Sequence, residues 1–399
     1  MRIIKKSFPQ VNHSKTRIIE LFAQIYLNIF LTNFPIGKIL LKSYLVKTKD
    51  KKLKNYTLIR LIEQSIKQYK LDLSSHNILM PVYSSEPALM PVLASLAGAK
   101  NVYVTTRELD AINRTAFYEN QLELTSTINF IEKESPQTLS GLDIVLVGEG
   151  VSYIDSKFVS ALKKECIISI LPQNLDFNQA SGVNIEECVK KKIPVVAVDP
   201  NDHNLQLYRQ LAHMVVKRCC ENNIDILKSR LLLISNGSLA DNILSHLKSC
   251  GAQVYCANTD KPQDRSYILK HLPEVDAVIV ADYPLKSTLV VGNEGFIRIE
   301  DILNINPEIK IIHLAGKMQA NSLTANRIYY KPENLIQNSL NVNIKEMGLR
   351  AAIEIATASM KIAESLIKIK NRTILPNDSV VTYNIINADG PVVLGRVNF

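Results

Sequence analysis

From residue 77 onward, short runs of β-branched and other apolar residues alternate with stretches of helical composition. This alternation restricts the fold more than any other feature, because a buried parallel strand needs a crossover helix before the next strand can pair with it. It predicts an α/β protein with doubly wound parallel sheets. The predicted strands are Ile78–Tyr83, Val102–Thr105, Thr127–Ile131, Ile144–Val147, Ile167–Leu171, Val195–Val198, Leu231–Ser235, Gln253–Ala257, Ala277–Ala281 and Ile309–Leu314.

Two long helical stretches, Leu205–Asn223 and Asn343–Ile369, lie on either side of the last four strands. This arrangement indicates that the second group of strands is inserted between two parts of the first. We therefore expect two Rossmann-like domains preceded by a helical N-terminal extension. The expected parts are an extension at 1–74, an outer domain at 75–205 and 335–399, and a Rossmann domain at 206–334.

Composition limits the class of protein. The hydrophobic content of 46% is that of a chain with sizeable cores. Much of the net charge of +9 comes from the lysine-rich segment 42–54, so a nucleic-acid partner has little support. The apolar stretch 18–34 is interrupted by polar residues, which argues against a membrane span, and the six cysteines form no C-x-x-C pair. We expect a cytoplasmic protein with reduced thiols, no bound metal and no membrane partner.

One local motif follows a predicted strand and opens a predicted helix. Residues 234–240 read Ile-Ser-Asn-Gly-Ser-Leu-Ala, which fits S-x-G-x-x-A rather than G-x-G-x-x-G. Small residues at such a turn let the backbone approach a pyrophosphate, and the helix N-terminus supplies free N–H groups. The motif predicts a dinucleotide site formed by Ser235, Gly237, Ser238 and Leu239.

The residues at the ends of the next strands leave the kind of dinucleotide open. An acidic residue is expected to hold the ribose at the end of the second strand, but that place holds Asn258, with Asp260 two positions later. Asn258 could bond a ribose, or leave room for a 2′-phosphate beside Lys261, so the cofactor is NAD or NADP. A Rossmann domain that has lost its nucleotide is the alternative. His313, at the end of a later strand, is either close to the nucleotide or a core histidine.

A polar segment after the strand 195–198 offers candidate acid/base groups. Asp202 and His203 follow this strand, and open α/β sheets bind ligands at the carboxyl ends of their strands. His203 could exchange protons near neutral pH, with a carboxylate to orient the ring. The alternative is that His203 is a capping or hinge residue.

About half of the chain, from residue 140 to 335, resembles the formate/glycerate dehydrogenase-like superfamily. That superfamily includes the D-2-hydroxyacid dehydrogenases and S-adenosylhomocysteine hydrolase. The segments that carry the resemblance are 182–196, 251–254 and 276–280. The resemblance implies a split outer domain, an inserted NAD domain and homodimers built through the nucleotide domain.

The sequence departs from that superfamily at its catalytic positions. Where the dehydrogenases place an arginine that orients the substrate carboxylate, this chain has Gly316, so Lys317 is the candidate substitute. The late Pro-His pair of the dehydrogenases is missing, and the lysine expected after Asn201-Asp202 in the hydrolase is replaced by Gln206. The candidate catalytic set is therefore His203, Asp202 and Lys317.

These observations predict an NAD(P)-dependent oxidoreductase that acts on a small polar metabolite between its two domains. Three alternatives stay open. The chain could be a non-catalytic or regulatory binding protein derived from this fold, an enzyme similar to S-adenosylhomocysteine hydrolase, or a scaffold subunit that uses its N-terminal helices to bind a partner.

Overall fold

The computed structural model of the chain describes most residues between 56 and 397. The described residues are 56–81, 89–105, 112, 115, 128–148, 154–171, 182–199, 202, 204–283, 285–335, 340–342, 344–370, 381–387 and 390–397.

The first sheet has eight strands, in the order β16-β15-β6-β5-β4-β1-β2-β3. Its strands are β1 (Asn77–Pro81), β2 (Asn101–Thr105), β3 (Ile128–Ile131), β4 (Ile144–Val147), β5 (Ile167–Ile170), β6 (Val195–Val198), β15 (Val381–Asn387) and β16 (Gly390–Val397). The six strands β1 to β6 are parallel and follow the 3-2-1-4-5-6 order of a Rossmann sheet. The strand β15 pairs antiparallel with β6 and extends the sheet to β16.

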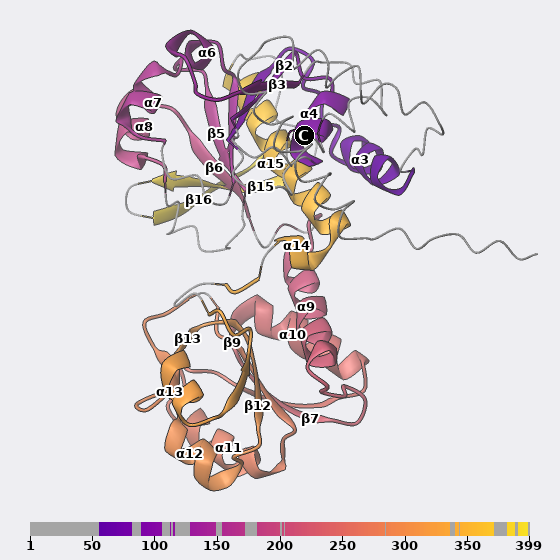
Figure 1. Ribbon diagram of the computed structural model, residues 1–399, viewed down its shortest axis with the longest axis vertical. Helices are drawn as coiled ribbons and strands as arrows, with labels where there is room; N and C mark the ends of the chain where they lie inside the picture. Colours follow the sequence, from indigo (N-terminus) through magenta and orange to yellow (C-terminus); the bar gives the residue numbers. More distant parts are fainter. Residues whose placement is uncertain are drawn as a thin grey trace, which may run out of the picture. The chain divides into compact units, whose positions relative to one another are not determined.

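Helices pack against this sheet in two groups (Figure 1). One group covers the cluster built by Leu79, Val145 and Ile168 on the strands. These helices are α6 (Pro136–Ser140), α7 (Ser156–Ala161) and α8 (Ile185–Lys191). The other group centres on the long helix α15, which packs against β4, β5 and β6 as well as against its neighbouring helices. Its members are α3 (Tyr56–Tyr69), α4 (Leu89–Leu96) and α15 (Leu349–Lys370).

The second sheet has five parallel strands, in the order β14-β12-β9-β7-β8. They are β7 (Arg230–Ser235), β8 (Gln253–Ala257), β9 (Ala277–Ala281), β12 (Lys310–Ala315) and β14 (Tyr329–Lys331). Counted along the chain this order is 2-1-3-4-5, so the winding reverses between β7 and β9. At this switch point the loops after β7 and β9 leave the sheet in opposite directions, which makes room for a ligand.

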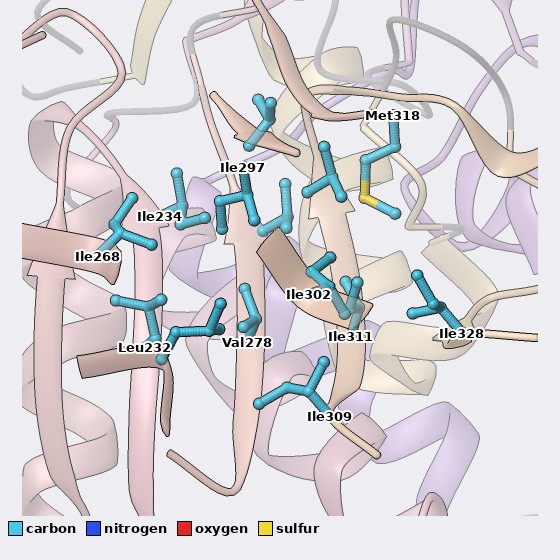
Figure 2. Close-up of a cluster of buried hydrophobic side chains, with 14 of the residues drawn as sticks. Leu232, Ile234, Ile268, Val278, Ile297, Ile302, Ile309, Ile311, Met318 and Ile328 are labelled. Carbon is cyan, nitrogen blue, oxygen red and sulfur yellow. The ribbon is translucent and has the colours of Figure 1, made fainter. Parts of the chain in front are cut away.

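Helices cover both faces of the five-stranded sheet as well. The helices α9 (Leu207–Glu221) and α10 (Gly237–Ser249) pack on one face. The other face meets α11 (Asp264–His271), the short 3-10 helix η3 (Leu272–Glu274), α12 (Ile299–Ile305) and α13 (Ala320–Ala325). Figure 2 shows the cluster on this second face, where Leu232, Ile234, Val278 and Ile311 from three strands meet Ile302 from α12. Alternate residues of β7 therefore enter opposite cores, as a doubly covered strand requires.

The doubly wound α/β architecture predicted from the alternating pattern is confirmed. Four details differ from the prediction. The strand β14 of the five-stranded sheet was not predicted. One edge of the eight-stranded sheet is an antiparallel hairpin of β15 and β16. A small parallel sheet of β10 (Leu289–Gly292), β11 (Ile297–Arg298) and β13 (Lys317–Met318) was not predicted. The helical stretch 343–369 divides at Gly348, whose φ of +96° separates α14 (Ile344–Met347) from α15.

The strands β1 to β6 form the first sheet, and β15 and β16 return to it after the five-stranded sheet. The domain boundaries remain a prediction, and residues 1–55 of the predicted extension at 1–74 lie outside the described residues. No helix within the described ranges is long and apolar enough to cross a membrane.

Candidate functional site at the switch point of the five-stranded sheet

The turn from β7 into α10 lies at the switch point of the five-stranded sheet. Gly237 opens the helix with φ of +59°, a conformation that costs an L-residue free energy but is accessible to glycine. A Cβ built on Gly237 would have no heavy atom within 4 Å, so the outer side of the turn is open. The backbone here is exposed and can be approached closely by a ligand.

The first turn of α10 has no side-chain cap. Asn236 is the N-cap residue, and asparagine is among the best N-cap residues, yet its side chain makes no capping hydrogen bond. Only the Ala240 N–H bonds back to the Asn236 carbonyl, at 3.4 Å. The helix thus begins with N–H groups that lack a side-chain acceptor and with the positive end of its dipole, which together favour an anion.

The Asn236 side chain instead turns toward a buried carboxylate at the end of β9. The Asn236 Nδ2 donates to Asp282 Oδ1 at 2.8 Å, and the Thr259 hydroxyl lies 3.1 Å from both oxygens of the same carboxylate. The Asp282 N–H donates to the carbonyl of Ala315 on β12. Asp282 is 1% exposed and so links the carboxyl ends of β7, β8, β9 and β12. Burial, assisted by the nearby Asp260, raises the pKa of Asp282 above its ordinary value, while Thr259 and Lys286 oppose that shift.

Gly316 is held close to this carboxylate. Its φ is +109°, and a Cβ at this position would meet the Asp282 Cβ at 3.1 Å and a Val290 methyl group at 3.3 Å. A side chain at Gly316 would therefore be strained by the backbone conformation and crowded by its neighbours.

The rim beside β8 carries the residues predicted to hold the ribose. The Asn258 Oδ1 accepts from the Asp260 N–H at 2.9 Å, and the Asn258 N–H donates to Asp264. The exposed carboxylate of Asp260 forms an ion pair with Lys286, which follows β9. Lys286 thereby places a positive charge on the rim, which the sequence motif did not indicate.

Two of the other predicted cofactor residues, Ser235 and Leu239, have side chains that are buried inside the protein. The Ser235 hydroxyl is buried and donates to the Ala281 carbonyl at 2.6 Å, so it joins β7 to β9. The Leu239 side chain is buried in the core, whereas Ser238 is exposed on the first turn. Only Gly237 and Ser238 therefore present themselves to a ligand at the turn, together with the Leu239 N–H.

His313 is bonded within the protein. Its Nε2 lies 2.8 Å from the Gly316 carbonyl, and its Nδ1 lies 3.4 Å from the Asn341 Nδ2. The carbonyl of His313 accepts from Arg218 at 2.7 Å. Burial lowers the pKa of the imidazole to about 4, so the ring is neutral at physiological pH. This geometry is that of a core histidine, which was the second of the two interpretations left open.

The structure describes two of the three predicted catalytic residues. Asp202 is buried, and its Oδ1 accepts from the N–H groups of Asn204 and Leu205 ahead of α9. Lys317 is exposed on β13 of the small sheet. His203 lies outside the described residues. The catalytic assignment therefore remains a prediction.

Sequence reasoning missed the residues that organise the turn, which are Asn236, Thr259, Asp282 and Lys286. Each of them follows a predicted strand of the second group, at 231–235, 253–257 or 277–281. Carboxyl ends of neighbouring parallel strands meet at one edge, so this position alone could have grouped them. The motif at 234–240 indicates the glycine of the turn but not the polar residues at the ends of the neighbouring strands.

No model of a known protein family matches the sequence, and no curated protein matches it. Solved structures do match. The A chain of dipicolinate synthase from Bacillus subtilis aligns with 76% of this chain and 98% of its own length, at 11% identity and a TM-score of 0.48. NAD-dependent formate dehydrogenase from Staphylococcus aureus, solved in complex with NAD, aligns with 80% of this chain and 99% of its own, at 9% identity and a TM-score of 0.47.

The NAD⁺-bound 3-phosphoglycerate dehydrogenase of Entamoeba histolytica aligns with 75% of this chain and 97% of its own, at 13% identity and a TM-score of 0.39. The chain resembles these proteins in fold. Formate and 3-phosphoglycerate dehydrogenases, the kind of protein that the sequence resembles, are among the matching structures. At such low identity the likeness concerns the fold alone, and the chemistry has to come from this chain's own residues.

Proposed function

We propose that the turn between β7 and α10 binds the pyrophosphate of NAD or NADP and that the chain is an oxidoreductase for a small polar metabolite. The observation that carries the proposal is the exposed, positive-φ Gly237 at the switch point, followed by a helix turn without a side-chain cap. A pyrophosphate supplies the acceptors and the negative charge that this turn lacks.

The residues present fit a dinucleotide. The N–H groups of Ser238 and Leu239 belong to the first turn of α10, next to Gly237, and the 13 residues of α10 contribute their aligned dipoles. On the rim, the Asp260 carboxylate could accept from a ribose hydroxyl, or Lys286 could pair with a 2′-phosphate once the ion pair between them opens. When bound, the nicotinamide would accept or donate hydride. The matching dehydrogenases, solved with NAD, agree with this proposal.

A second candidate is a non-catalytic binding protein of the same fold. This candidate is favoured because the described acid/base candidates already form hydrogen bonds within the protein. Asp202 is occupied by two backbone N–H groups, and both ring nitrogens of His313 have partners inside the core. A protein of this kind would bind the dinucleotide at the same turn without turning over a substrate.

Calorimetric titration of the purified, nucleotide-stripped chain with NAD, NADH, NADP and NADPH tests the proposal. Gly237→Asp places a carboxylate where the pyrophosphate would lie and should weaken binding at least about a hundredfold, by charge repulsion and by filling the open side of the turn. Gly348→Asp is the matched control, because Gly348 also has a positive φ and open space around a built Cβ.

The control variant should suffer similar backbone strain while binding as tightly as the parent. If none of the four dinucleotides binds the parent chain, the proposal is wrong. If a dinucleotide binds and no hydroxyacid, ketoacid or aldehyde changes its oxidation state, the non-catalytic alternative is the better account.

A further inference from the structure

An asparagine in the N-cap position that does not cap its helix needs an explanation. A free Asn236 side chain would gain a hydrogen bond by turning its Oδ1 to an N–H of the first turn of α10. That conformation would occupy the same N–H groups that an incoming anion needs. In the structure the side chain is drawn in the other direction, with its Nδ2 2.8 Å from Asp282.

The carboxylate that holds Asn236 is positioned by several strands. Thr259 lies within 3.1 Å of both Asp282 oxygens, and the Asp282 N–H is fixed by Ala315. Burying a carboxylate is costly, and a buried group with this many partners has a defined orientation. The Asp282 carboxylate lies near the helix end that we propose binds a negatively charged ligand. Attraction to that ligand therefore cannot explain why a carboxylate occupies this position.

We propose that Asp282 is a positioning residue of the dinucleotide site, which holds the Asn236 side chain off the first turn of α10 and so keeps that turn free for the pyrophosphate. This inference rests on the proposed function. Asp282 acts through Asn236 and does not itself contact the ligand.

The proposal and simple electrostatics predict opposite results for Asp282→Ala. Removing a nearby negative charge should strengthen the binding of an anion. If Asp282 instead restrains Asn236, its removal releases the side chain to cap α10, and the dinucleotide must then displace that cap. We expect Asp282→Ala to weaken NADH or NADPH binding, whichever the parent chain binds, by about tenfold.

The double variant Asn236→Ala/Asp282→Ala distinguishes capping of α10 by a released Asn236 side chain from a general loss of structure at the site. Without an asparagine side chain nothing can cap the turn, so binding should return to within about threefold of the parent. A purely structural role for Asp282 predicts the reverse, since the second substitution would remove further contacts. Asp276→Ala, which deletes a carboxylate just before the amino end of β9, is the matched control and should bind as the parent does.

Amide hydrogen exchange of the unliganded proteins provides a readout that needs no ligand. The N–H groups of Ser238 and Leu239 should exchange fast in the parent, become protected in Asp282→Ala and exchange fast again in the double variant. Failure of the parent to bind any dinucleotide would refute the proposed function, while this exchange pattern would still decide whether Asp282 restrains Asn236. Binding by Asp282→Ala as tight as the parent's or tighter, no recovery in the double variant, or unchanged exchange would each overturn the inference.

Discussion

The buried His313 makes the stability of the chain depend on pH in a calculable way. Its imidazole has a pKa of about 4 in the folded state, because burial disfavours the charged ring, against an ordinary value of 6.5. As the pH drops below 6.5, His313 takes up a proton in the unfolded chain but stays neutral in the folded chain. The free energy of unfolding therefore falls. Linkage gives a loss of about 2 kcal/mol at about pH 5, growing to about 3 kcal/mol below the folded pKa.

Urea unfolding followed by circular dichroism, at neutral pH and at about pH 5, measures this loss. The control is His313→Gln, which cannot titrate but offers an amide to Gly316 and Asn341. The pKa values of His76 and His246 are also lowered by burial, and these residues are present in both proteins, so their effects cancel in the comparison. The parent should lose about 2 kcal/mol more than the variant between the two conditions. Equal losses in the two proteins would refute the assignment of a neutral, buried His313.

Four further substitutions test other parts of the structure. Arg218→Met should cost about 2 to 4 kcal/mol, because the carbonyls of His313 and Asn341 lose a buried donor, and thermal unfolding measures the loss. Glu364→Gln should cost about 3 kcal/mol, because Lys361, itself 7% exposed, loses the charge it pairs with; a neutral effect in urea titration would contradict the pairing. Tyr69→Phe should leave stability unchanged or raise it by up to about 1 kcal/mol, because the buried phenol oxygen has no hydrogen-bond partner among the described residues; a loss in denaturant titration would contradict this. Asp202→Ala should cost about 1 to 2 kcal/mol of unfolding free energy through the lost acceptor of Asn204 and Leu205, whereas a loss of turnover at unchanged stability would support the catalytic prediction instead.

The alternation of apolar runs and helical stretches in the sequence was sufficient to predict the α/β architecture. Strands such as Val195–Val198 and Ala277–Ala281 were predicted with the bounds that the structure gives, because strands buried on both faces are continuous apolar runs flanked by polar residues. The hairpin of β15 and β16 and the small sheet were harder to predict. In each case one pairing joins strands that are distant in the sequence, β10 with β13 and β15 with β6.

The candidate site was predicted only in part. The backbone requirement at Gly237 is local and was visible in the sequence motif. The role of Ser235 was not visible, and His313 was left open between two interpretations, because their hydrogen bonds run to Ala281 and Gly316, which a single-sequence pattern does not place beside them. The function of Asp282 depends on Asn236 and Thr259, from the ends of two other strands, and only the sheet order brings the three together.

A crystal structure of the chain with NADH or NADPH tests the central claim most directly. The account predicts pyrophosphate oxygens within about 2.7–3.2 Å of the N–H groups of Ser238 and Leu239, with the Asn236 side chain still on Asp282. A dinucleotide bound elsewhere, with its phosphates away from the first turn of α10, would contradict it.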